Sequence, residues 1–170
     1  GTIKKIWLTH GHIDHAGGVM ELKERTDATI EGAHPEEEFW FSQISEQVKR
    51  FGMDIEARNV VTDRWLDDGD KVELGENTFR ISFTPGHAPG HIIFYHERTK
   101  LAFVGDTLFK GSIGRTDLPR GDHQTLITSI VEKLWPLGDD VTCIPGHGPM
   151  TTIGAERATN PFVGDAALGT

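Results

Sequence analysis

Apolar and polar positions follow two different periods along the chain, and the shorter period comes first. The stretch from Ile3 to Thr9 is mostly apolar and too short for a helix, so we expect a buried strand that ends just before His10. Short runs typical of strands follow one another at residues 72–74, 79–83, 91–95 and 101–104, with turn residues between them. A further strand is expected at residues 141–144.

Two stretches show the helical period instead. Phe41, Ile44, Val48 and Phe51 recur at steps of three and four and predict an amphipathic helix with an apolar core face, and the acidic residues 36–38 lie near its positive N-terminal end. Asp122 is a suitable N-cap for a second helix, in which apolar positions 126, 127, 130, 131 and 134 share one face. No linker or repeat interrupts the pattern. The sequence therefore predicts an α/β fold with a single domain over residues 1–170.

Composition and charge narrow the range of partners. The chain has 17 Lys and Arg against 26 Asp and Glu, a net charge of -9, which disfavours binding to nucleic acid and to anionic membrane surfaces. No apolar run reaches the roughly 20 residues of a membrane span, and the N-terminus has no signal-peptide pattern. Cys143 is the only cysteine, which excludes an intrachain disulfide and a cysteine-based zinc cage. We therefore expect a cytoplasmic location, in a reducing compartment.

Candidate chemistry is concentrated in four short segments, each of which follows an expected strand. The first runs from Thr9 to His15 and holds three imidazoles and a carboxylate, a density that individual structural roles do not explain. In the other three segments, a glycine lies next to the candidate ligand and allows the backbone to turn tightly. Together the segments supply five histidines and two aspartates, which are ligands favoured by Zn, Fe(II) and Mn: His10, His12, Asp14, His15, His87, Asp106 and His147.

The remaining reactive residues receive a structural interpretation first. His34, His91, His96 and His123 have no neighbouring ligand motif, and only His91 lies close enough in sequence to the site to donate a hydrogen bond to it. Cys143 lies in an apolar run and is expected to be an inert buried thiol. The four tryptophans are assigned to packing.

The order of the four segments resembles the metallo-β-lactamase superfamily, whose HxHxDH signature is matched without a gap from His10 to His15. The resemblance implies the αββα sandwich of that superfamily. It also implies two divalent metal ions, with Zn expected first and Fe or Mn as further possibilities. By the same resemblance the ions are bound as follows: His10, His12 and His87 hold the first, Asp14, His15 and His147 hold the second, and Asp106 bridges the two.

Further stretches are similar to glyoxalase II, the hydroxyacylglutathione hydrolases, and most of all to a small bacterial branch of that family. These stretches are residues 105–109, 114–117, 145–149 and 160–162. The resemblance implies hydrolysis of S-lactoylglutathione or a related small hydroxyacyl thioester, with Asp14 and Asp106 as catalytic residues. Such chemistry agrees with the site. Two cations lower the pKa of a shared water from near 15.7 to about 7, which gives a hydroxide nucleophile at neutral pH. A thiolate is a good leaving group, so the reaction needs no separate general acid.

Two basic residues beyond Asp106 are candidates for binding an anionic substrate. By the resemblance, Arg115 would hold a carboxylate of the glutathione moiety, a task that suits the planar guanidinium. Lys110 is a candidate by its position alone.

The chain departs from the family pattern in three places. His10 stands near the start, whereas the family has several strands before it, so we expect the first N-terminal strands of the fold to be lacking and a second copy of the chain could cover the exposed side. Only 23 residues follow His147, too few for the helical C-terminal domain of the larger glyoxalase II enzymes. Asp117 stands where those enzymes have an aromatic glutathione contact.

Two other functions stay open at this point. A persulfide dioxygenase of the same fold also carries HxHxDH and a Gly-Arg-Thr-Asp stretch but binds a single Fe(II). An inactive metal-binding fragment of the fold is the second alternative. The stretch Gly146 to Pro149 resembles the hydrolases and therefore favours a hydrolase over the dioxygenase.

Overall fold

The first apolar run forms a strand, as its pattern predicts. In the computed structural model, which describes residues 1–170, β1 (Lys5–Leu8) pairs in parallel with β2 (Thr29–Gly32), with Ile6 opposite Ile30. The helices α1 (Ile13–Ala16) and α2 (Val19–Thr26) connect the two strands, and a 3₁₀ turn (Pro35–Glu37), α3 (Glu38–Phe41) and α4 (Ile44–Arg50) follow β2.

The strands expected in the middle of the chain form a six-stranded sheet in the order β10-β9-β6-β5-β4-β3. Strands β3 (Lys71–Leu74), β4 (Asn77–Phe83), β5 (Ile92–His96) and β6 (Leu101–Gly105) pair antiparallel in sequence order. Strand β9 (Thr142–Pro145) lies parallel to β6, and β10 (Thr151–Thr152) closes the edge. Because β6 and β9 are parallel, the residues that follow both strands emerge at the same end of the sheet.

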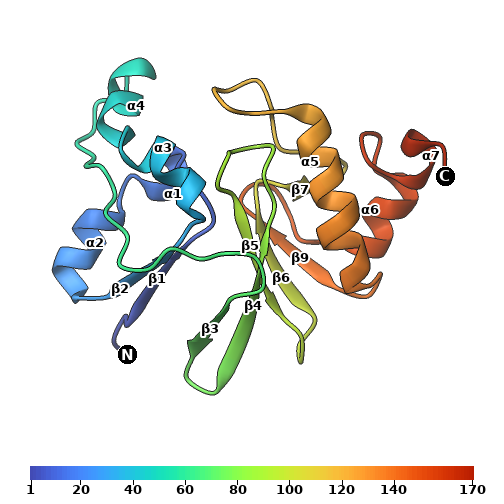
Figure 1. The fold of residues 1–170 in the computed structure, drawn as a ribbon, viewed down its shortest axis with the longest axis horizontal. Helices are drawn as coiled ribbons and strands as arrows, with labels where there is room; N and C mark the ends of the chain where they lie inside the picture. The colour runs from blue at the N-terminus through green and yellow to red at the C-terminus, as the bar shows by residue number, and fades with distance from the viewer.

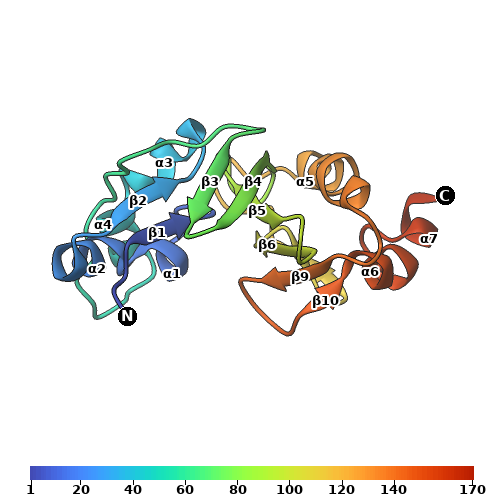
Figure 2. The same ribbon diagram turned by 90° about the horizontal axis from the view of Figure 1, so that it is seen from below.

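The helices in the second half of the chain cover the face of the six-stranded sheet that is turned away from β1 and β2 (Figure 1). Asp122 caps α5 (His123–Ser129) as predicted, its side chain accepting from the Thr125 amide. A π-helical turn (Ile130–Leu134) and a 3₁₀ turn (Trp135–Leu137) continue α5, and α6 (Ile153–Thr159) and α7 (Asp165–Leu168) lie beside it. Seen from below, the two sheets lie between two groups of helices, which confirms the predicted α/β sandwich (Figure 2).

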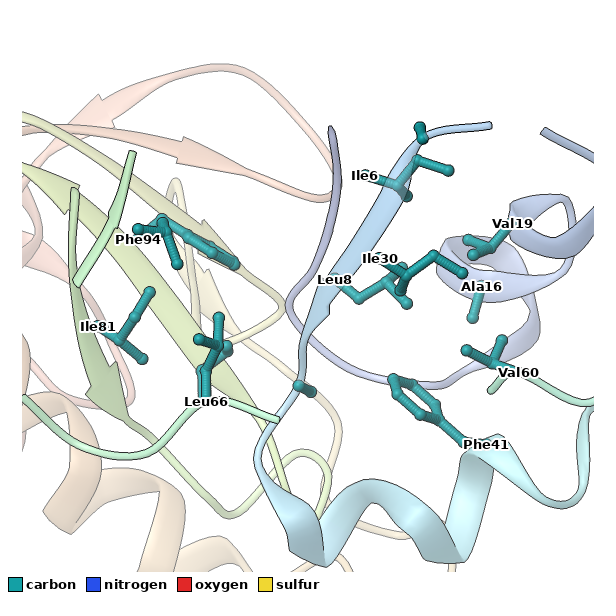
Figure 3. Packing of buried hydrophobic residues seen from close by; sticks show 14 of the residues in the cluster. Ile6, Leu8, Ala16, Val19, Ile30, Phe41, Val60, Leu66, Ile81 and Phe94 are labelled. Carbon is teal, nitrogen blue, oxygen red and sulfur yellow. The ribbon is translucent and has the colours of Figure 1, made fainter. Parts of the chain in front are cut away.

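Two hydrophobic clusters fill the spaces between these layers. In the first cluster, Leu8 and Ile30 of the small sheet face Phe41 on one side, while Ile81 and Phe94 belong to the large sheet (Figure 3). The second cluster lies under α5, between the large sheet and its helices. Full burial of one large aliphatic or aromatic side chain stabilises a fold by about 1.5–3 kcal/mol, so these clusters hold the strand ends in place.

The structure corrects the expected helix over residues 41–51. It breaks between α3 and α4, where Ser42 and Gln43 donate side-chain hydrogen bonds to backbone carbonyls such as that of Phe39, a local alternative to helical bonding. Phe51 is 48% exposed and not part of the core, and Glu37 is buried instead of solvated near the helix end. The sequence also did not reveal β2 or the two-residue strands β7 (Leu108–Phe109), β8 (Ser112–Ile113) and β10. The two-residue strands are too short to show a period.

None of the helices has both the length and the apolar character that crossing a membrane requires.

Candidate metal centre

Four loops that follow strands bring the candidate ligands to one end of the two sheets. His10 and His12 lie in the turn between β1 and α1, and His87 lies in the loop after β4. Asp106 follows β6 directly, and His147 comes two residues after the end of β9. The seven residues singled out from the sequence therefore meet in space, in two adjacent groups.

The first group consists of His10, His12 and His87, all of which are buried. Their ligand atoms lie within 4.8 Å of one another, and His12 Nδ1 is 3.0 Å from His87 Nε2. Two nitrogens bound tetrahedrally to one zinc ion at about 2.0–2.1 Å lie roughly 3.3 Å apart. The spacing of this group is therefore suitable for one metal ion.

The second group consists of Asp14, His15, Asp106 and His147 and is more open to solvent. His15 Nε2 lies 3.3 Å from Asp14 Oδ2 and 3.2 Å from Asp106 Oδ1. His147 Nε2 lies 2.9 Å from Asp14 Oδ2, and the side chains of Asp14 and His147 are about half exposed, at 49% and 56%. This group could hold a second ion on the side that faces solvent.

Asp106 stands between the two groups. Its Oδ2 atom lies 3.3 Å from His87 Nε2 of the first group and 3.4 Å from His147 Nε2 of the second. Its Oδ1 atom faces His15. One carboxylate thus contacts both groups, which is the placement that a bridging ligand needs.

An unpaired polar atom shows that these residues fit a metal ion. The buried atom His10 Nε2 has no hydrogen-bond partner. A buried polar group without a partner destabilises a protein by about 1–3 kcal/mol, so this nitrogen is costly to bury unless a cation binds there. Imidazole and carboxylate are also the donors that Zn, Fe and Mn accept.

Burial and mutual contacts set the protonation states of the two groups differently. Burial, reinforced by neighbouring imidazoles, lowers the pKa of His12 to about 3 and that of His10 well below its usual range. For His15 burial also acts to lower the pKa, but the carboxylates of Asp106 and Asp14 outweigh it and raise the pKa to about 9. Burial acts to raise the pKa of Asp106, and contacts with His15 and His87 nevertheless hold it well below its ordinary value. His10 and His12 are therefore neutral and ready for a cation, whereas in the absence of a cation His15 forms a carboxylate–imidazolium cluster with Asp14 and Asp106.

Two hydrogen bonds orient the candidate ligands, and the sequence revealed only one of the two partners. His87 Nδ1 donates to the Arg115 carbonyl at 2.7 Å, which leaves the Nε2 lone pair of His87 free for a cation. His91 is buried, and its Nε2 accepts from the Asp106 amide at 3.1 Å while Nδ1 lies 3.0 Å from Thr84 Oγ1. His91 thus contacts the site, but as an acceptor from the Asp106 backbone and not as the donor that its position in the sequence suggested, whereas nothing in the sequence identifies a backbone carbonyl.

The backbone at Gly146 lies tightly against two candidate ligand side chains. A Cβ atom there would lie 2.2 Å from Asp106 Oδ1 and 2.6 Å from His15 Cε1. Any side chain would therefore displace a candidate ligand, which explains a glycine directly before His147.

Two polar side chains that sequence reasoning missed hold the HxHxDH loop. Gln47 accepts from the Ile13 amide at 2.9 Å and donates to the Gly11 carbonyl at 3.0 Å. Glu37 accepts from the Gly11 amide at 2.8 Å, and burial raises its pKa to about 7. Both residues belong to the helical stretch for which the pattern predicted only packing and solvated charge.

A cavity of about 500 Å³ opens onto the two groups, and much of its wall is apolar. Arg115 is part of the wall, but its guanidinium makes a two-point ion pair with Asp117, at 2.7 and 2.9 Å. Lys110 is exposed and does not line the cavity. Trp40 and Phe51, which the sequence assigned to packing, do line it. The lining residues apart from Arg115 and the candidate ligands are Ile13, Trp40, Gln47, Phe51, Phe109, Ser112, Ile113 and Leu118.

Comparison with known proteins identifies the family. The family model described as metallo-beta-lactamase superfamily matches residues 1–147. The chain belongs to this superfamily. A Haemophilus influenzae member named hydroxyacylglutathione hydrolase GloC is 48% identical over 163 residues, which cover 95% of this chain and 76% of the relative.

Solved structures of the superfamily show the same fold. The BLEG-1 B3 metallo-beta-lactamase superposes with a TM-score of 0.85 at 36% identity. The match covers 94% of this chain and 77% of the BLEG-1 chain. The protein TTHA1623, solved in a di-iron-bound form, superposes with a TM-score of 0.83 at 37% identity, and the match covers 93% of this chain and 76% of the TTHA1623 chain. These similarities confirm the fold and support a hydrolase with candidate metal-binding groups.

Proposed function

We propose that this protein is a binuclear metal-dependent hydrolase that cleaves a small hydroxyacyl thioester, of the S-lactoylglutathione type, into a hydroxy acid and a thiol. The observation that carries the proposal is the pair of ligand groups sharing Asp106 at the floor of an open cavity. The 48% identity to a protein named hydroxyacylglutathione hydrolase supports the thioester as substrate.

The seven clustered residues divide into two sets of metal ligands in this proposal. Bound divalent cations, with Zn expected first and Fe or Mn as alternatives, supply an acidified water as nucleophile and a Lewis acid for the carbonyl oxygen. His10, His12 and His87 would hold one ion, Asp14, His15 and His147 would hold the other, and Asp106, which contacts both groups, would serve both ions.

Asp14 is the residue that would orient the attacking water. Its contact with His15 lowers the pKa of the Asp14 carboxyl, so the side chain is an acceptor throughout the neutral range. Asp14 lines the cavity, and its Oδ2 atom contacts both His15 and His147. An anionic acceptor in this position fixes the direction of the O–H bond and hence of the attacking lone pair.

The cavity fits an acyl group and a thiol carrier of moderate size. Its apolar wall would shield the reacting carbonyl, and Arg115 would attract a carboxylate of the carrier. The departing thiolate is the conjugate base of an acid of pKa about 8.5, so this reaction needs no separate general acid. Lys110 lies outside the cavity wall and would act only on an extended anionic carrier.

The experiment that tests this function is anaerobic turnover by the Zn-loaded protein. We expect free thiol to appear from S-lactoylglutathione, to disappear when His147 is replaced by Ala, and to persist when the control residue His123 at the start of α5 is replaced by Ala. Oxygen should not change the rate.

Three results would contradict the proposal in different ways. Oxygen consumption with glutathione persulfide by the Fe form, with an inert Zn form, would establish a dioxygenase. Hydrolysis of a β-lactam in preference to thioesters would ally the chain with BLEG-1 in activity as well as fold. Metal-loaded protein that turns over none of these substrates would be an inactive metal-binding fragment.

A further inference from the structure

One buried carboxylate joins the two loops that carry the first ligand group. Glu37 is fully buried at the end of the 3₁₀ turn that precedes α3. Its Oε1 atom accepts from the Gly11 amide at 2.8 Å, and its Oε2 atom accepts from the Gly90 amide at 2.6 Å. Gly11 stands between His10 and His12, and Gly90 stands three residues after His87. The two oxygens of one side chain therefore connect all three histidines of that group.

We propose that Glu37 is a positioning residue for the first metal ion, and this proposal rests on the binuclear site of the proposed function. It sets the distance between the β1–α1 turn, which supplies two imidazoles, and the loop after β4, which supplies the third. Groups that orient metal ligands contribute strongly to metal affinity even though they do not touch the metal.

Close packing makes this connection rigid. A Cβ atom on Gly90 would lie 2.2 Å from the Glu37 amide nitrogen, so the backbones of the two segments are in direct contact. A Cβ atom on Gly11 would lie 2.6 Å from Phe41 Cδ1 and 2.9 Å from Trp40 Cβ. The segment from Glu37 through α3 therefore presses on both loops, and neither loop can shift toward it.

The chemistry of the two donors requires a carboxylate at this position. Two backbone N–H groups from different loops converge on one side chain, and a carboxylate offers an acceptor to each. A glutamine has the same shape but only one acceptor, and its NH₂ group would face the second N–H donor. Glu37→Gln (E37Q) therefore releases one loop while it leaves the packing almost unchanged.

The experiment measures metal binding at the first group alone. In a D14A/H147A background, which removes two exposed ligands of the second group, zinc affinity is determined by competition with a chelator, and the absorption spectrum of the Co(II) form is recorded. We expect E37Q to weaken zinc binding by about 10- to 100-fold, the range known for groups that orient metal ligands, and to alter the Co(II) bands. In an H12A background, which impairs the first group, E37Q should leave zinc affinity unchanged.

A second buried carboxylate provides the matched control. Glu156 is 3% exposed and accepts from the Gly111 amide and the Thr151 hydroxyl, away from both ligand loops. Glu156→Gln in the same D14A/H147A background should leave zinc affinity and the Co(II) spectrum unchanged.

The proposal is overturned if E37Q leaves the first-group affinity and spectrum unchanged, or if it weakens both groups equally. If E37Q does not fold, Glu37→Asp (E37D) takes its place, because it keeps the charge but is too short to reach both loops. E37D should give the same selective loss, and unchanged binding by E37D would overturn the proposal as well. None of these measurements uses a thioester, so failure of the proposed reaction would be recognised separately.

Discussion

Neighbouring histidines of this site differ in the proton that each must lose before it can bind a metal ion. Without metal, the carboxylates of Asp106 and Asp14 outweigh burial and raise the pKa of His15 to about 9, so its imidazole carries a proton at pH 7. Burial lowers the pKa of His12 to about 3, so its imidazole is already neutral. Metal binding must displace the ionising proton of the His15 imidazolium, whereas the neutral His12 imidazole already has a free lone pair.

We therefore expect metal affinity of the second group to rise roughly tenfold per pH unit from pH 7 to pH 9 and to level off above it. Affinity of the first group should be flat over the same interval. Calorimetric titrations in two buffers with different ionisation enthalpies measure the released proton. A second ion that binds at pH 7 without releasing a proton would show that His15 is already neutral and the prediction wrong.

Arg115 is less available to a substrate than its position in the sequence suggests, because Asp117 occupies two of its donors. A substrate carboxylate has to compete with this exposed partner. Asp117→Asn should therefore lower KM for S-lactoylglutathione by roughly two- to five-fold, the modest effect expected for an exposed pair, and leave kcat unchanged. Arg115→Ala should raise KM more than it lowers kcat.

Steady-state kinetics with an uncharged thioester serve as the control for both variants, since neither change should affect its KM. An unchanged KM for S-lactoylglutathione in the Arg115→Ala variant would rule out the carboxylate contact.

Among the elements, the hairpin β7–β8 depends on a residue almost fifty positions away. Asn160, which follows α6, donates from Nδ2 to the Ser112 carbonyl at 3.0 Å, and its Oδ1 accepts from the Phe162 amide at 2.9 Å. Phe109 and Ser112 of this hairpin line the cavity. The Asn-Pro-Phe stretch therefore has a physical role, which is to fasten the cavity wall to α6.

Replacing Asn160 by Ala should lower the free energy of unfolding by about 1–3 kcal/mol, because it leaves the part-buried Ser112 carbonyl and the buried Val163 amide unpaired. KM for the thioester should rise as the hairpin loosens, while the metal content stays the same. The control is Thr159→Ala, whose exposed hydroxyl bonds only to the Ala155 carbonyl of its own helix. Chemical denaturation and metal analysis check both variants, and loss of metal from the Asn160 variant would refute this separation of roles.

The elements that the sequence predicted are those with a clear period and a clear end. Strands β3 to β6 and the capped helix α5 contain enough residues to show which face is buried. The break between α3 and α4 was not predictable, because it results from side-chain bonds by Ser42 and Gln43 that a hydrophobic pattern does not record.

The same distinction holds for the site. Three imidazoles within six positions indicate a metal site in a sequence, and the structure brings all seven candidate ligands together. The sequence did not predict the roles of Glu37, Gln47 and the Arg115 carbonyl. These groups bond to the backbone or are part of it, and backbone hydrogen bonds do not depend on residue type in a way that a sequence pattern records.

At the scale of the whole molecule, the two ligand groups connect segments that otherwise belong to different hydrophobic clusters. Asp14 and His15 lie beside the β1–β2 sheet, whereas Asp106 and His147 follow β6 and β9 of the large sheet. A bound ion therefore links the two sheets. Because such an ion binds the folded chain and not the unfolded one, it stabilises the fold by about 4 kcal/mol when its free concentration is a thousandfold above Kd.

Metal removal by a chelator should accordingly lower Tm by on the order of 10 °C in a chain of this size, and added zinc should restore it. Differential scanning calorimetry measures the shift. An Asp106→Ala variant should show a much smaller response to the chelator, since its carboxylate contacts both groups. Equal Tm values with and without metal in the unaltered protein would contradict the idea that the ions connect the sheets.

The position of Trp40 gives this metal centre a built-in optical signal. The Trp40 indole packs edge-on against the His12 imidazole, with the ring centres 4.9 Å apart. A Co(II) or Fe(II) ion held by His12 would quench the fluorescence of this indole, whereas zinc, with its filled d shell, would leave most of it intact. The loss of tryptophan emission on metal loading of the purified protein would thus distinguish Co(II) or Fe(II) in the first group from zinc.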